Sequence, residues 1–140
     1  MRIDGMHTPV NIIERYINEH SLPLEPVNFI VLSLDYNIDP SFALATWILE
    51  TGNGSLMMWK QNNNPAGIKC GEDYCSYPSK DAGLAQMFNL LNQYATGSIS
   101  WIGQRNTIRE IREAWNPENK DCWKIYEIML QIAAEGGTYG

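Results

Sequence analysis

The sequence predicts one mainly α domain of about six helices, with a small β-hairpin and loop lobe after the third helix. The chain has 140 residues, 44% of them hydrophobic and 19% charged, which suits a single folded domain over residues 1–140. Apolar residues recur at helical spacing through most of the chain. Residues 53–78 break this pattern, because they are rich in Gly, Asn and Pro and have no sustained helical period.

Proline signals predict where the first and third helices begin. Thr8-Pro9 is typical of an N-cap followed by proline at the first helical position. Residues 21–26 contain two prolines and end this helix. A second helix over roughly residues 27–36 is apolar on most sides, so we expect it to be buried. Asp39-Pro40 begins the third helix by the same logic as the first, and Gly52 ends it.

The second half of the chain is predicted to supply the hairpin and three more helices. The hairpin covers roughly residues 67–77. Ser79 caps the fourth helix, and Thr107-Ile-Arg-Glu110 fits a capping box that opens a short fifth one. Asn116-Pro117 stops the fifth helix, and a last helix follows over about residues 120–135.

Charge and hydropathy exclude several classes of protein. A formal net charge of −6 argues against a nucleic-acid partner, because such proteins need a basic surface for the phosphates. No apolar run approaches the roughly 20 residues of a membrane span. The N-terminus lacks the apolar core of a signal peptide, so either the protein has no leader or its leader lies outside these residues. We expect a monomer.

The three cysteines do not indicate a metal site. Cys70 and Cys75 flank a short loop, and the sequence leaves open whether they form a disulfide. Cys122 lies in a later helical pattern and is expected to be a buried thiol. A zinc site built from these cysteines with His7 or His20 lacks the usual ligand spacing. We therefore expect no metal and no cofactor.

Glu50 is the main candidate for chemistry. It closes the apolar helical stretch over residues 41–50, and a Gly-containing turn follows at once. A carboxylate at a helix C-terminus lies among unpaired carbonyls that carry partial negative charge. This field and the apolar neighbours disfavour the ionised form, so we expect a raised pKa. A Glu that stays protonated near neutral pH is what glycosidic-bond cleavage needs as a general acid. The alternative is a solvated Glu at a helix end.

Glu50 opens an ordered set of motifs. Glu50-Thr-Gly-Asn-Gly54 comes first, Asn63-Asn-Pro-Ala-Gly-Ile-Lys69 follows, and Tyr77-Pro-Ser-Lys-Asp-Ala-Gly-Leu84 comes next. Residues 107–117 end the set with an Ile-x-x-x-Trp-x-Pro pattern. This order resembles the lysozyme-like peptidoglycan hydrolases, above all the N-acetylglucosaminidases of glycoside hydrolase family 73. The resemblance covers about residues 9–130 and implies an α+β lysozyme-like fold.

The resemblance implies a role for each matching residue. Glu50 matches the catalytic acid of the family. Asn63 and Asn64 match an Asn pair that shapes the floor of the cleft, although Asn also serves purely structural roles in turns. Tyr77 lies in a segment that borders the cleft in the family. Trp115 is a candidate for stacking on a sugar ring, with packing in the core as the alternative.

The sequence offers two candidates for a second catalytic carboxylate. The family usually carries a longer β-lobe that supplies it, whereas here the short segment between Ile68 and Tyr77 offers Glu72 and Asp73. Retaining glycosidases hold their two carboxyl groups about 5 Å apart, and inverting ones about 6.5–9.5 Å apart. Glu72 or Asp73 is therefore a candidate to position water, with a solvated turn as the alternative.

The sequence thus predicts a peptidoglycan glycan-strand hydrolase, of the endo-β-N-acetylglucosaminidase or muramidase type, with Glu50 as general acid. Its partner is bacterial peptidoglycan, and it acts on the cell wall as a secreted, phage-released (endolysin) or virion-associated protein. One alternative is a lytic transglycosylase that uses Glu50 as its sole acid and base. Another is a wall-binding domain of the same fold without activity.

Overall fold

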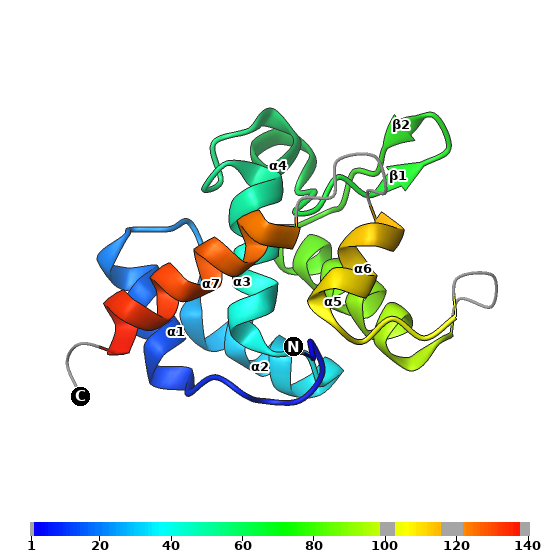
Figure 1. Ribbon diagram of the computed structural model, residues 1–140. Helices are drawn as coiled ribbons and strands as arrows, with labels where there is room; N and C mark the ends of the chain where they lie inside the picture. The colour runs from blue at the N-terminus through cyan, green and yellow to red at the C-terminus, as the bar shows by residue number, and fades with distance from the viewer. Residues whose placement is uncertain (1, 99–102, 116–121, 138–140) are drawn as a thin grey trace.

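The computed structural model describes residues 2–98, 103–115 and 122–137. The described residues form seven helices and one two-stranded antiparallel sheet (Figure 1). In chain order these are α1 (Val10–Glu19), α2 (Pro26–Tyr36), α3 (Pro40–Thr51), α4 (Met57–Asn62), β1 (Lys69–Cys70), β2 (Asp73–Tyr74), α5 (Lys80–Thr96), α6 (Ile108–Trp115) and α7 (Cys122–Gly137). The predicted fold class, mainly α with a small hairpin lobe after the third helix, is confirmed.

Helix α3 is the centre of the core. Every residue from position 40 to position 48 is buried, and the helix packs against α1, α2 and α7. The Asp39 carboxylate caps it by accepting a hydrogen bond from the Phe42 amide at 3.3 Å. Gly52 ends it in the left-handed conformation, with φ of 58°. Both predicted ends of the helix are confirmed, so Glu50 lies where a core helix emerges from the protein.

The predicted cap of α1 is wrong. The helix begins at Val10, and Pro9 at the N-cap provides no side-chain hydrogen bond. The Thr8 amide and hydroxyl instead donate to the Asp39 carboxylate, at 2.9 and 3.0 Å. Asp39 is fully buried and also accepts from the His7 amide at 3.0 Å. The Asp39 carboxylate thus holds the segment before α1 against the start of α3.

The expectation that α2 is buried is also wrong. Only Phe29 and Ser33 are buried, whereas Val27, Val31 and Leu34 are 63%, 44% and 56% exposed. The reason is that α2 packs against α1, α3 and α5 with the side that carries Phe29 and Ser33, and its other side is exposed. Phe29 contacts Phe88 of α5 edge-on, with ring centroids 5.2 Å apart.

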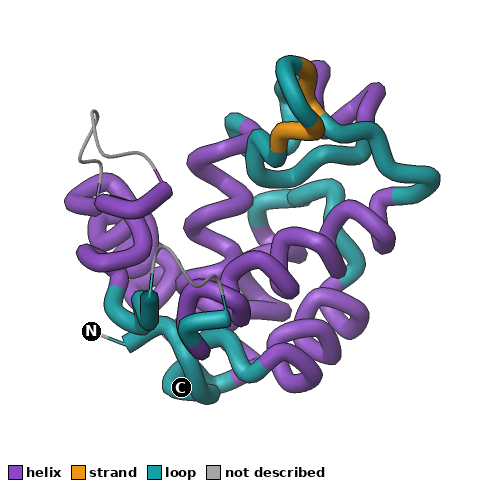
Figure 2. The backbone as a smooth tube through the Cα atoms, turned by 90° about the vertical axis from the view of Figure 1, so that its right-hand side faces the viewer, coloured by secondary structure: helices purple, strands orange, loops and turns teal. Residues whose placement is uncertain are grey.

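Residues 53–78 form a lobe at one end of the molecule, and Figures 1 and 2 both place α4 and the hairpin there. The expected long loop contains the short helix α4, which the sequence did not reveal because six residues are too few to show a helical period. Trp59 of α4 is buried against Trp47 of α3, with ring planes at 87°. The predicted hairpin is confirmed, with Lys69 opposite Tyr74 and Cys70 opposite Asp73.

The remaining helices follow the prediction with small differences. Ser79 caps α5 by accepting from the Ala82 amide at 3.0 Å. At α6, the Thr107 hydroxyl accepts from the Glu110 amide and donates to the Glu110 carboxylate, so only one half of the capping box forms. Cys122 begins α7 and is half-buried, not fully buried as expected.

The structure settles the question of the disulfide, because Cys70 and Cys75 are bonded to each other. The residues that the structure describes hold no group of three or more His, Cys, Asp or Glu side chains placed to bind a metal ion. No helix within the described ranges is both long and apolar enough to cross a membrane.

Candidate active site

The turn after Glu50 is held rigidly. The Thr51 hydroxyl donates to the Trp47 carbonyl at 2.5 Å and accepts from the Gly54 amide at 2.9 Å. A side chain at Gly54 would collide with Pro23 at 2.6 Å, so this turn packs tightly on the loop after α1. Glu50 is therefore carried on a fixed backbone, with its side chain 22% exposed.

Glu50 forms an ion pair with Arg112. The Arg112 Nη2 donates to Glu50 Oε1 at 3.0 Å, and only 1% of the Arg112 side chain is exposed. The prediction from sequence considered only the helix end and the apolar neighbours, both of which disfavour the ionised carboxylate. The structure adds an opposite charge, which favours the ionised form.

Sequence reasoning missed Arg112, although a signal was present. Helix α6 places Ile108, Ile111 and Arg112 on one face, at the i, i+3 and i+4 spacing of a buried stripe. All three are buried, whereas Arg109 is exposed. A lone arginine at an apolar position of an amphipathic helix calls for a carboxylate partner from elsewhere in the fold. The sequence does not say which carboxylate this is.

Gly67 and Tyr74 lie on the other side of the Glu50 carboxylate. A Cβ at Gly67 would be 3.9 Å from Glu50 Oε2 and 3.8 Å from Tyr74 Cε1. Gly67 has φ of 65°, which glycine adopts without strain. The second carboxylate oxygen is therefore beside the loop backbone and near the ring of Tyr74. Tyr74 was not among the predicted site residues.

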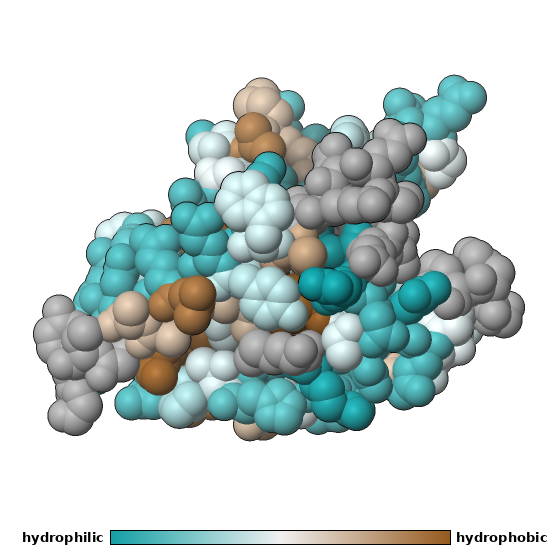
Figure 3. Space-filling model, in the orientation of Figure 1, coloured by the Kyte–Doolittle hydropathy of each residue, from teal (hydrophilic) through white to brown (hydrophobic). Residues whose placement is uncertain are grey.

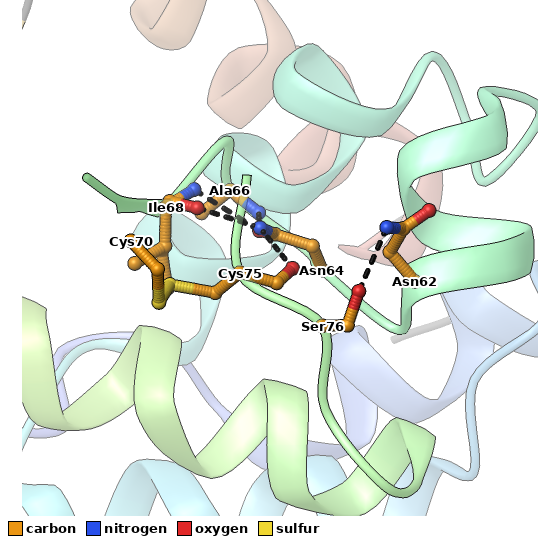
Figure 4. Close-up of a disulfide and its surroundings, with 7 residues drawn as sticks. All are labelled: Asn62, Asn64, Ala66, Ile68, Cys70, Cys75 and Ser76. Atoms are coloured by element: carbon orange, nitrogen blue, oxygen red, sulfur yellow. Dashed lines mark hydrogen bonds between the residues drawn. A yellow bond between two sulfur atoms is a disulfide. The ribbon is translucent and has the colours of Figure 1, made fainter. Parts of the chain in front are cut away.

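Asn64 organises the loop that carries Gly67 (Figure 4). Its amide nitrogen donates to the carbonyls of Ile68 and Cys75, at 2.8 and 3.0 Å. Its amide oxygen accepts from the backbone amides of Ala66 and Ile68, at 3.3 and 3.1 Å. Asn64 is fully buried. It therefore fixes the loop beside Glu50 and ties this loop to the chain leaving the hairpin.

Asn63 and Tyr77 meet through the backbone. Asn63 ends α4 with φ of 56°, and its side-chain amide donates to the Tyr77 carbonyl at 2.8 Å. The Tyr77 amide in turn donates to the Asn62 carbonyl at 2.9 Å. The Tyr77 side chain is half-buried, and burial raises the pKa of its phenol. Both predicted Asn residues thus hold the lobe together by hydrogen bonds within the protein.

Glu72 and Asp73 lie at the tip of the hairpin. Both are exposed, with Glu72 in the turn and Asp73 in β2. The Tyr74 ring is on the Gly67 side of the sheet. Because neighbouring residues of a strand point to opposite faces, the Asp73 side chain points to the other side. Trp115 ends α6, and its side chain lies outside the described part of the structure.

A groove begins at Gly67. It has a volume of about 410 Å³ and runs between the loop, the start of β1 and α5, lined by Ala66, Gly67, Ile68, Lys69, Leu90 and Tyr94. A larger cavity of about 470 Å³, between α1, α3 and α7, contains none of the predicted site residues. The view in Figure 3 shows a mainly hydrophilic face with apolar side chains gathered over α7 and at the tip of the α4 lobe. Glu50 does not line this groove, and Gly67 is the lining residue that lies beside its carboxylate.

Residues 28–133 match the glucosaminidase family, described as mannosyl-glycoprotein endo-beta-N-acetylglucosaminidase. The chain belongs to the glucosaminidase family. This confirms the resemblance to the lysozyme-like glucosaminidases that the motifs indicated, and it confirms the enzyme class, a glycoside hydrolase. A comparison with curated proteins finds no significant match.

The fold of this glucosaminidase is similar to that of a solved enzyme. The structure of S. aureus autolysin E in complex with the muropeptide NAM-L-Ala-D-iGlu superposes with a TM-score of 0.73. The two chains are 19% identical, and the match covers 98% of this chain and 72% of the other. At 19% identity, this likeness shows that the two proteins share a fold.

Proposed function

We propose that this glucosaminidase cleaves the glycan strands of bacterial peptidoglycan, with Glu50 as the general acid. The observation that carries the proposal is the setting of the Glu50 carboxylate. One oxygen is held by Arg112, and the other lies beside Gly67, where the groove begins. The family and a fold neighbour solved with a muropeptide support this substrate class.

In the proposed reaction, a protonated Glu50 gives its proton to the glycosidic oxygen as the bond to the anomeric carbon breaks. The leaving sugar departs as an alcohol, and positive charge develops at the anomeric carbon. Glu50 is then a carboxylate beside the Arg112 guanidinium, an arrangement that stabilises its ionised form. A water molecule completes hydrolysis when Glu50 takes one of its protons.

We propose that Glu50 acts without a second protein carboxylate. The exposed positions of Glu72 and Asp73, and the side of the sheet to which Asp73 points, support this choice. The N-acetyl group of the substrate then serves as the internal nucleophile that occupies the anomeric carbon before water attacks. The alternative, in which Glu72 or Asp73 positions that water, is tested by the variants Glu72→Gln and Asp73→Asn.

Analysis of the products tests the reaction. Purified peptidoglycan digested by the wild-type protein should give fragments with reducing N-acetylglucosamine ends in mass spectrometry. Fragments ending in 1,6-anhydro-N-acetylmuramic acid would instead identify a lytic transglycosylase. If the wild-type protein releases no fragment from any peptidoglycan, the alternative of a wall-binding domain without activity takes the place of this proposal.

A further inference from the structure

Arg112 is a buried cation on the apolar face of α6. It shares this face with Ile108 and Ile111, which are both fully buried. Residues 2–4 hold the start of this helix in place. The backbones of Arg2 and Thr107 form an isolated antiparallel β-bridge, and the Ile3 amide donates to the Asn106 carbonyl at 2.7 Å. Burying a charge is costly unless it is paired, so a fold that seats a guanidinium here needs a reason beyond packing.

The contact with Glu50 supplies this reason. Arg112 Nη2 holds Oε1 at 3.0 Å, while Oε2 lies beside Gly67, which lines the groove. We propose that Arg112 is the positioning residue of this glucosaminidase, an inference that rests on the proposed function of Glu50. It fixes the carboxyl group so that Oε2 carries the proton toward the groove, and it stabilises the carboxylate that remains after the proton has left.

Other described groups lie on the side of Glu50 away from Arg112 or belong to its own helix. From β2, Tyr74 lies beside Gly67, and from β1 the Lys69 ammonium lies 5.6 Å from the centre of the Tyr74 ring. The last carbonyls of α3 itself carry partial negative charges, which oppose ionisation of Glu50. Among the described side chains, Arg112 is the cation for which a contact with the Glu50 carboxylate is measured.

The positive charge of Arg112 determines the direction in which this residue shifts the pH dependence of activity. An opposite charge makes the Glu50 carboxyl a stronger acid, so it loses its proton at lower pH than it would alone. Because a general acid works only while protonated, activity falls on the alkaline side as Glu50 ionises. Without the Arg112 charge, this alkaline limb should move to higher pH, by about one pH unit. If Arg112 supported only the packing of α6, its loss would lower the activity at every pH and leave the alkaline limb in place.

The test compares Arg112→Met, Arg112→Lys and Arg109→Met. Arg109 is on the exposed face of the same helix, so its variant removes the same charge outside the site. Two measurements are made on each folded variant: the pH profile of kcat on purified peptidoglycan, and the titration of the Glu50 carboxyl carbon by NMR. If Arg112→Met does not fold, Arg112→Gln replaces it.

We expect Arg112→Met to move both the alkaline limb and the carboxyl titration upward by about one pH unit. Its kcat at the optimum should fall at least tenfold, with KM nearly unchanged. Arg112→Lys should leave the limb in place but with a lower kcat, and Arg109→Met should behave as the wild type. If Arg112→Met leaves both midpoints unmoved, the inference is overturned, whatever happens to the rate. A wild type without activity would refute the proposed function alone, because the NMR titration still measures the effect of Arg112 on Glu50.

Discussion

Glu50 and Arg112 form an ion pair at 3.0 Å that joins the last turn of α3 to the buried face of α6. The pair therefore links the helix that carries the proposed acid to a helix that comes after the hairpin and α5 in the chain. Glu50 accordingly has a structural role in addition to its proposed chemical one, and this role has a measurable consequence.

Glu50→Ala should destabilise the fold. The substitution removes the carboxylate that faces a buried guanidinium. For a fully buried pair, such a change lowers the free energy of unfolding by roughly 3–5 kcal/mol. Because 22% of the Glu50 side chain is exposed, we expect a loss of about 2 kcal/mol in urea unfolding. Glu50→Gln keeps an oxygen acceptor for Arg112, so its loss should stay below about 1 kcal/mol. Equal stability of Glu50→Ala and the wild type would show that the ion pair does not hold α6.

Asn64 and Asn63 should differ in their contribution to stability. Asn64→Ala removes a buried side chain with four hydrogen-bond contacts to backbone groups, so we expect a loss of about 3 kcal/mol in the free energy of unfolding. Asn63→Ala removes one contact to a carbonyl and the preference for the left-handed conformation, a loss of about 1 kcal/mol. Chemical denaturation of both variants measures this difference. A larger loss of unfolding free energy for Asn63→Ala would contradict the role of Asn64 as the residue that fixes the loop beside Glu50.

Gly83 should not tolerate a side chain. Its Cβ would lie 1.8 Å from the Asn63 carbonyl oxygen, because α5 packs directly on the loop after α4. Gly83→Ala must push the lobe away from α5, so we expect a loss of about 3 kcal/mol or more and weaker lytic activity. Gly71→Ala is the matched control, since its Cβ would meet nothing within 4 Å and only its φ of 75° is unfavourable. Thermal unfolding of the two variants should rank Gly83→Ala well below Gly71→Ala.

Reduction of the Cys70–Cys75 disulfide should weaken the hairpin. The bond closes a short loop with a sequence separation of 5, for which chain entropy predicts about 2 kcal/mol of stabilisation. Because β2 carries Tyr74 beside Gly67, we expect lytic activity to fall together with stability when dithiothreitol is added. The double variant Cys70→Ser with Cys75→Ser should already show the lower activity and respond no further to the reductant. An unchanged wild type under full reduction would show that the bond is not needed by the site.

Local signals in the sequence predicted much of the fold. Asp39, Gly52 and Ser79 act as caps because each effect is confined to one helix turn. The hairpin was predictable for the same reason, since turn residues separate two short segments. Thr8 shows the limit of this reasoning, because a buried carboxylate from another segment captured its hydroxyl. The exposure of α2 likewise depends on where the helix lies in the fold and not on its composition.

The candidate site also contains both residues that the sequence could predict and residues that it could not. Glu50, Asn63 and Asn64 belong to a local motif, so the sequence could identify them. Arg112 and Tyr74 approach Glu50 only through the packing of α6 and the register of the hairpin. A pattern of residue types along the chain does not determine either arrangement. Tertiary contacts between segments far apart in the sequence therefore complete the site that the motif begins.

The rate of peptidoglycan digestion by Glu50→Gln tests the central claim most directly. This variant keeps the shape of the side chain and its contact to Arg112 but has no proton to donate to the leaving group. We predict a loss of about 100- to 10,000-fold in the release of soluble fragments, with unfolding close to that of the wild type. Glu72→Gln and Asp73→Asn, measured beside it, should retain most of the wild-type rate. Full activity of Glu50→Gln would contradict the account.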